Sequence, residues 1–106
     1  MAEKSLVINA SNRLKEIHGL SLKFNKLVGK PHQERLLELM RKHVDEIEDL
    51  VQKNDPHYLI ETGDLLILCF ELLLEGGADM DEVMLKCFGR YERKLTGLIK
   101  SEKRRA

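Results

Sequence analysis

The sequence has 106 residues, the length of one domain, and its 34% charged and 42% hydrophobic residues exclude a disordered chain. Eighteen basic and eighteen acidic residues give a formal net charge of zero, which removes the basic excess that nucleic-acid binding requires. The sequence shows neither a signal peptide nor a membrane-spanning stretch. Cys69 and Cys87 lie at apolar helical positions, where we expect free thiols of the kind found in a reducing compartment. We therefore expect one cytoplasmic domain over residues 1–106 with no nucleic-acid or membrane partner.

The first two expected helices each carry apolar residues at helical spacing. One covers residues 3–28 and ends at Gly29. Pro31 opens the next, because its missing N–H costs little in a first turn, and the apolar stripe of that helix runs from Leu36 to Val51. We expect His18, His32, His43 and His57 to be surface or capping residues.

A third helix is expected over residues 56–75, where Asp55 can cap and Pro56 can occupy the first turn. It is apolar almost all round after Asp64, which is typical of a helix that is buried on every side. A monomer of 106 residues has few places for such a helix, so an oligomer is predicted. Asp79 and Glu82 form a capping-box pattern that opens a basic fourth helix over residues 79–102.

Four helices with short connections predict an all-α four-helix bundle, completed by oligomerisation as a homodimer or homotetramer. Its most informative part is an acidic helix hairpin over residues 34–75. There Glu46 and Asp49 are three residues apart, as are Glu61 and Asp64, so each pair projects from one face of its helix. Both pairs are symmetric about position 55, so we expect Asp49 to face Glu61 and Glu46 to face Asp64.

Four carboxylates around one small volume would repel one another unless a cation lies between them. Magnesium favours oxygen ligands and keeps water molecules for a phosphate partner, so a Mg²⁺ site is predicted, with Mn²⁺ as a possible substitute. A solvated acidic face is the alternative for the first pair. A di-iron bundle is excluded because its Glu-x-x-His spacing does not occur.

Three segments of the chain carry a family resemblance: "DEIED" at 45–49, "ETGDLL" at 61–66 and "KCFGRYERKL" at 86–95. Together they resemble the all-α nucleoside triphosphate pyrophosphohydrolases of the MazG-like group, whose signature is EExxE on one helix and ExxD on the next. Phe88 stands where that family often has an asparagine. The closest correspondence is "ETGDLL".

The resemblance implies that the protein is an enzyme that hydrolyses a nucleoside triphosphate, NTP or dNTP, to the monophosphate and pyrophosphate with Mg²⁺. Metal ions would neutralise the phosphate oxygens and acidify the attacking water. Glu46 or Glu61 would orient that water, while Lys86, Arg90 and Arg93 would lie near the phosphates. The implied metal ligands are Glu46, Asp49, Glu61 and Asp64.

Two other functions fit the same pattern. Phosphoribosyl-ATP pyrophosphohydrolase of histidine biosynthesis shares the acidic helices, and residues 77–90 resemble its closing helix too. A non-enzymatic helical interaction protein would also have apolar stripes at helical spacing. Magnesium separates the interaction protein from the enzymes, because only a metal-dependent enzyme predicts that the ion stabilises the folded state.

Overall fold

The computed structural model describes the backbone of residues 2–105 and the side chains of residues 12–105. The chain forms four helices: α1 (Ala2–Leu27), α2 (His32–Gln52), α3 (Tyr58–Glu75) and α4 (Met80–Arg105). Residues 2–105 contain no strand, so the prediction of an all-α fold is confirmed. None of these helices combines the length and the apolar character that crossing a membrane would require.

The helix ends follow local signals in the sequence. Gly29 and Gly77 have φ of 70°, a left-handed conformation that suits glycine after a helix end. The Asp55 carboxylate accepts a hydrogen bond from the backbone N–H of His57 at 2.9 Å. The Asp79 carboxylate accepts one from the N–H of Asp81 at 3.0 Å. These contacts confirm the predicted stop at Gly29 and the predicted cap at Asp79. Helix α3 instead begins at Tyr58 with His57 as its N-cap, so Asp55 and Pro56 lie in the turn before the helix and not in its cap and first turn.

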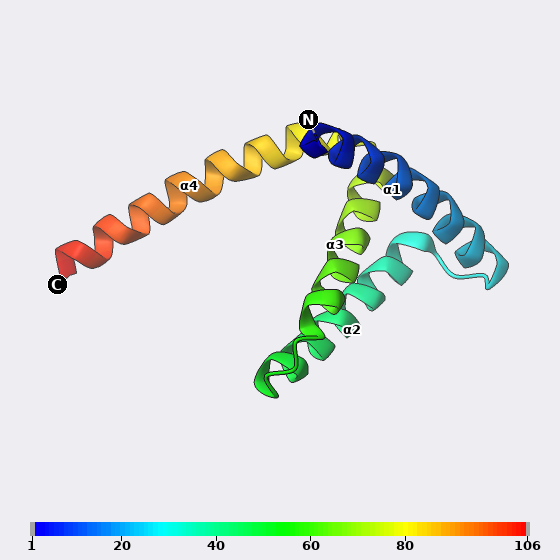
Figure 1. Ribbon diagram of the computed structural model, residues 1–106, viewed down its shortest axis with the longest axis horizontal. Coiled ribbons are helices and arrows are strands. Elements are labelled where there is room, and N and C mark those ends of the chain that lie inside the picture. The colour runs from blue at the N-terminus through cyan, green and yellow to red at the C-terminus, as the bar shows by residue number, and fades with distance from the viewer. Residues whose placement is uncertain (1, 106) are drawn as a thin grey trace.

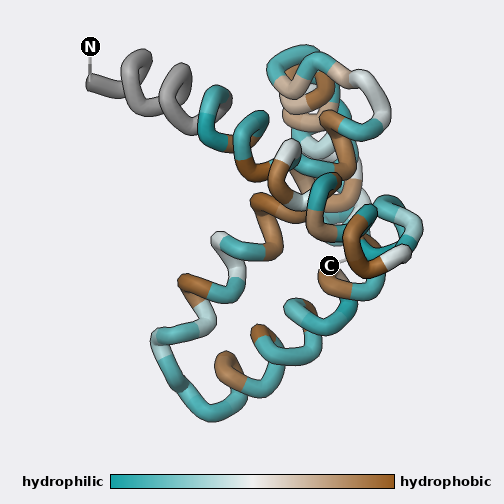
Figure 2. The backbone as a smooth tube through the Cα atoms, turned by 90° about the vertical axis from the view of Figure 1, so that its right-hand side faces the viewer, coloured by the Kyte–Doolittle hydropathy of each residue, from teal (hydrophilic) through white to brown (hydrophobic). Residues whose placement is uncertain are grey.

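Helices α2 and α3 form an antiparallel hairpin, and α1 lies across the end of the hairpin away from its turn (Figure 1). The turn is hydrophilic, whereas α3 becomes hydrophobic further along (Figure 2). Leu36 of α2 is fully buried and Leu68 of α3 is 8% exposed, and these are the buried hydrophobic residues of the described side chains. One chain therefore has a small core where α1, α2 and α3 meet.

Helix α4 extends away from this core as an arm (Figure 1). The radius of gyration is 17.3 Å, against about 13 Å for a compact domain of this length. The apolar face of the arm is open to solvent, and Phe88, Tyr91 and Leu95 are 63%, 63% and 53% exposed. A single chain thus does not close a four-helix bundle.

The third helix also differs from its prediction. Leu59 and Ile60 are both 60% exposed and Leu66 is 52% exposed, so α3 is not buried on every side within one chain. The physical reason is that α1 and α2 cover only one side of α3. Helix α4 would have to cover the other side, but it extends away from α3.

Candidate metal centre on the hairpin

Two residues of α2, His43 and Glu46, meet two residues of α3, Glu61 and Asp64; we call these four the hairpin cluster. The ligand atoms of His43, Glu46 and Glu61 all lie within 4.8 Å of one another. His43 Nε2 lies 3.5 Å from Glu61 Oε2 and 3.9 Å from Asp64 Oδ2. The hairpin thus gathers one imidazole and three carboxylates.

The hydrogen bonding of His43 determines what its Nε2 can do. Nδ1 lies 2.9 Å from the backbone carbonyl of Leu39, which can only accept, so Nδ1 carries the proton and donates. In the neutral ring Nε2 then presents a lone pair to two carboxylates. A cation or a hydrogen-bond donor between these groups would remove that conflict.

Glu61 is the most enclosed acid of the hairpin cluster. Its side chain is 17% exposed, and its Oε2 is buried with no hydrogen-bond partner among the described protein groups. Leaving a buried carboxylate oxygen unpaired is unfavourable. His57 Nε2 approaches the other oxygen at 3.5 Å, beyond the hydrogen-bond range of about 2.7–3.2 Å. A buried oxygen without a hydrogen bond, with the His43 imidazole 3.5 Å away and two further acids nearby, fits a metal ligand.

The expected pairing across the hairpin is wrong by about one helical turn. Glu46, rather than Asp49, approaches Glu61, and His43 takes the place beside Asp64. The Asp49 carboxylate instead accepts a 2.8 Å hydrogen bond from Lys53, and this contact raises the pKa of the Lys53 amine.

The turn explains this shift. Asn54 has a positive φ of 56°, so the chain reverses at residues 53–54 and not at 55. The stretch after Asp55 already winds in the direction of α3, since the N–H of Leu59 bonds the carbonyl of Pro56 at 3.1 Å. The residues that lie opposite each other on α2 and α3 are therefore displaced by about one helical turn from the expected pairs.

The three predicted phosphate-binding residues lie on α4, and the structure does not bring them to the hairpin cluster. Lys86, Arg90 and Arg93 occupy the arm that starts at the end of α3 away from the turn (Figure 1). Arg90 and Arg93 line a shallow hollow on α4 itself, together with Tyr91 and Lys94. Within one chain the acidic and basic residues are therefore separate.

Three histidines were wrongly predicted to be surface or capping residues. The side chains of His18, His32 and His43 are 15%, 9% and 20% exposed, and each faces carboxylates. His57, which is 56% exposed and precedes the first residue of α3, fits the prediction. The spacing of three residues between His43 and Glu46 was the available signal, because it puts both on one face of α2.

Comparison of the chain with protein-family models, curated proteins and solved structures gives no match. The function is therefore argued from the residues of the site.

Proposed function

We propose that this protein is a magnesium-dependent nucleoside triphosphate pyrophosphohydrolase that acts as a homo-oligomer. The observation that carries the proposal is the unpaired, buried Glu61 Oε2 inside the hairpin cluster. This glutamate belongs to the "ETGDLL" segment, the closest correspondence to the MazG-like pattern. A site for a cation and the motif that suggests one thus coincide.

The donor set suits a hard divalent ion. Glu46, Glu61 and Asp64 supply the carboxylate oxygens that magnesium prefers, and His43 lies beside them. Asp49 would join them by giving up its contact with Lys53 and binding the ion instead. The Asp49 side chain is 57% exposed and so is free to move. When bound, the metal would neutralise phosphate charge and acidify a water molecule.

The chain's own groups would do the rest of the chemistry. The reaction adds water across the bond between the α- and β-phosphates and yields a monophosphate and pyrophosphate. Glu46 or Glu61 would orient the water and accept its proton. Lys86, Arg90 and Arg93 would bind the phosphate oxygens, the arginines in the bidentate manner that their planar groups allow.

An oligomer would bring the basic helix to the acids. Four apolar residues of α4 follow alternate steps of three and four, as in helices that pair along one seam. All of them are more than half exposed in one chain: Phe88, Tyr91, Leu95 and Leu98. A second copy would cover this face, and its α4 would complete the site of the first.

Pyrophosphate release tests the activity. Wild-type protein would be incubated with a panel of nucleoside triphosphates and with phosphoribosyl-ATP, with and without magnesium. We expect metal-dependent release that Glu61→Gln reduces by about 10²–10⁴-fold. Glu48→Gln is the matched control, because it removes the same charge from an exposed position of α2. Release by neither substrate class would reject the enzyme and leave a helical interaction protein.

Sedimentation tests the assembly. We expect wild-type protein to sediment as a dimer or tetramer and Phe88→Asp to dissociate it, because a charge would enter an apolar interface. Thr96→Asp adds the same charge to another face of α4 and is expected to leave the assembly intact. Monomeric wild-type protein would contradict the proposed oligomer.

A further inference from the structure

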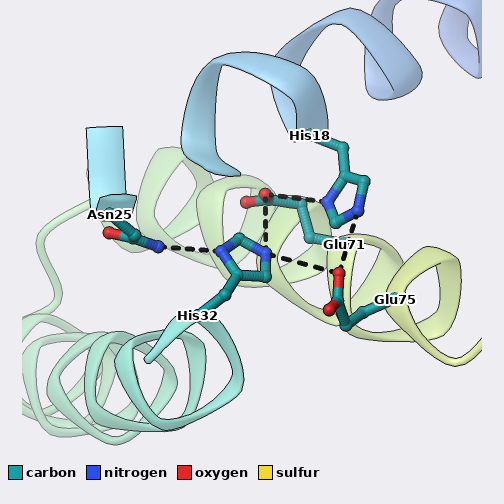
Figure 3. Close-up of polar contacts among 5 residues, drawn as sticks. All are labelled: His18, Asn25, His32, Glu71 and Glu75. Carbon is teal, nitrogen blue, oxygen red and sulfur yellow. Dashed lines mark hydrogen bonds and ion pairs between the residues drawn. The ribbon is translucent and has the colours of Figure 1, made fainter. Parts of the chain in front are cut away.

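A second set of polar side chains lies in the core, where α1, α2 and α3 meet (Figure 3). His18 comes from α1, His32 is the first residue of α2, and Glu71 and Glu75 lie one turn apart on α3. We call these four the three-helix cluster. Their side chains are 15%, 9%, 4% and 29% exposed, respectively, so the cluster is largely buried.

The separations between these groups are unusual for hydrogen bonds. His18 Nδ1 lies 3.4 Å from Glu71 Oε1, and His32 Nε2 lies 4.0 Å from the same oxygen. Ordinary hydrogen bonds measure about 2.7–3.2 Å. Two atoms bound to one tetrahedral zinc ion at about 2.0–2.2 Å would lie roughly 3.3–3.6 Å apart. The distance between His18 and Glu71 falls in this range, the distance between His32 and Glu71 is longer, and the ligand atoms of all three residues lie within 4.8 Å of one another.

His32 provides the second observation. Its side chain is nine-tenths buried, and its Nε2 is buried without a hydrogen-bond partner among the described groups. Figure 3 shows this nitrogen directed between Glu71 and Glu75. A buried polar atom without a partner costs free energy, and a metal ion in the centre of the cluster would satisfy it.

Both histidines also have an outer partner of the kind that supports metal ligands. The amide nitrogen Nδ2 of Asn25, which is 4% exposed, lies 2.8 Å from His32 Nδ1. In this orientation the amide donates to Nδ1, and the proton of the neutral ring is on Nε2. Turning that amide by half a rotation would let its oxygen accept the Nδ1 proton and leave the Nε2 lone pair free. Glu75 Oε2 lies 3.3 Å from His18 Nε2 and would accept that proton. Such partners orient ligating imidazoles.

The charges of the cluster favour a cation as well. Glu71 and Glu75 bring two carboxylates into a buried region, and no lysine or arginine among residues 12–105 forms an ion pair with either. Buried carboxylates are stable only when a positive group meets them. A divalent ion would offset this charge without requiring both histidines to be protonated.

We propose that the three-helix cluster is a zinc-type transition-metal site, with His18 Nδ1, His32 Nε2 and Glu71 Oε1 as ligands and Glu75 and Asn25 as outer partners. Two imidazoles and a carboxylate suit zinc better than magnesium. Its three ligands come from three helices, so the ion would fix α1 and the start of α2 to α3. Metal binding would then stabilise the packed core.

The test uses metal-free wild-type protein, the metal ion alone and equilibrium dialysis. We expect one zinc ion per chain, unaffected by a millimolar excess of magnesium, and a higher melting temperature. His32→Gln and Glu71→Gln are expected to weaken zinc binding by more than the roughly 10–100-fold expected for Asn25→Ala, which removes an outer partner. His57→Gln removes an exposed histidine and is the matched control. Zinc binding that His32→Gln leaves unchanged would overturn the proposal.

A measurement on the wild-type protein covers the case in which a variant does not fold. Imidazole nitrogen resonances report which ring atoms bind metal, and zinc is expected to shift His18 Nδ1 and His32 Nε2. Cobalt(II), as a substitute for zinc, is expected to give the intense visible absorption of a tetrahedral site. Absence of stoichiometric zinc binding, or resonance shifts confined to His43 and His57, would reject the three-helix site.

Discussion

The two histidine–carboxylate clusters differ in how the chain assembles them. The hairpin cluster joins two helices that are neighbours in sequence, and one short turn determines its geometry. The three-helix cluster joins α1, α2 and α3 and exists only where all three pack. The first is partly open, since the Asp64 side chain is 51% exposed, and the second is largely buried. If both proposals hold, the hairpin cluster would bind an exchangeable ion and the three-helix cluster a structural one.

Removing the largest core side chain is expected to disrupt both clusters at once. Leu36 lies on α2, which contributes to each cluster, and it is fully buried. Leu36→Ala would leave a cavity and lower the free energy of unfolding by about 2–5 kcal/mol, a large part of the roughly 5–15 kcal/mol typical of a domain. Urea unfolding followed by circular dichroism measures the loss. The neighbouring Leu37→Ala, at a 41% exposed position, is expected to lose less; equal losses would contradict this account of the core.

A change at His43 is expected to separate the clusters. His43→Gln removes the imidazole that faces Glu61 and Asp64, so manganese, used as a probe for the hairpin cluster, should bind about 10–100-fold more weakly. Zinc binding at the three-helix cluster should not change. Titration calorimetry with each ion measures both affinities. An equal loss for His57→Gln, whose side chain is 56% exposed, would mean that proximity to Glu61 alone matters.

The helices and their ends could be predicted from sequence because their signals are local. The cap at Asp79 and the glycines after α1 and α3 act within a few residues of the ends they determine. The same holds for the helical spacing of the acids. These features need no knowledge of the rest of the chain.

The relative placement of the helices could not be predicted in this way. The pairing of Glu61 with Glu46 depends on the left-handed residue Asn54, which moves the reversal of the chain away from position 55. The three-helix cluster depends on α1 crossing the hairpin, since His18 and Glu71 are 53 positions apart. The spacing of residues in the sequence indicates neither geometry. Helix α4 is exposed because no other helix of the same chain covers its apolar face.

Gly63 offers a way to sharpen the contrast between an open and a closed cluster. It lies in α3 between Glu61 and Asp64, and an added Cβ would meet nothing within 4 Å. Gly63→Ala should therefore raise the free energy of unfolding by about 0.8–1.0 kcal/mol through helix propensity. Gly97→Ala, in α4 and equally free of contacts, is expected to give a similar gain. Thermal unfolding measures both, and a loss of stability at Gly63 alone would show that the glycine meets a second copy.

The smallest expected effect concerns the thiol that lies on α3 between the two clusters. Burial raises the pKa of the Cys69 thiol above its ordinary value of 9.0. At pH 8 the thiolate fraction is therefore lower in the folded than in the unfolded protein, and alkylation by iodoacetamide should be slower than in urea. Because the pKa of this thiol is higher in the folded than in the unfolded protein, its contribution to the free energy of unfolding is complete below pH 9. That contribution is lost as the pH rises through the pKa of the folded protein. Mass spectrometry of the modified peptide against pH measures the rate. If the rate of alkylation depends on pH in the same way for the native protein as in urea, water reaches Cys69 freely. The region of α3 between the two clusters would then be more open than its packing against α2 implies.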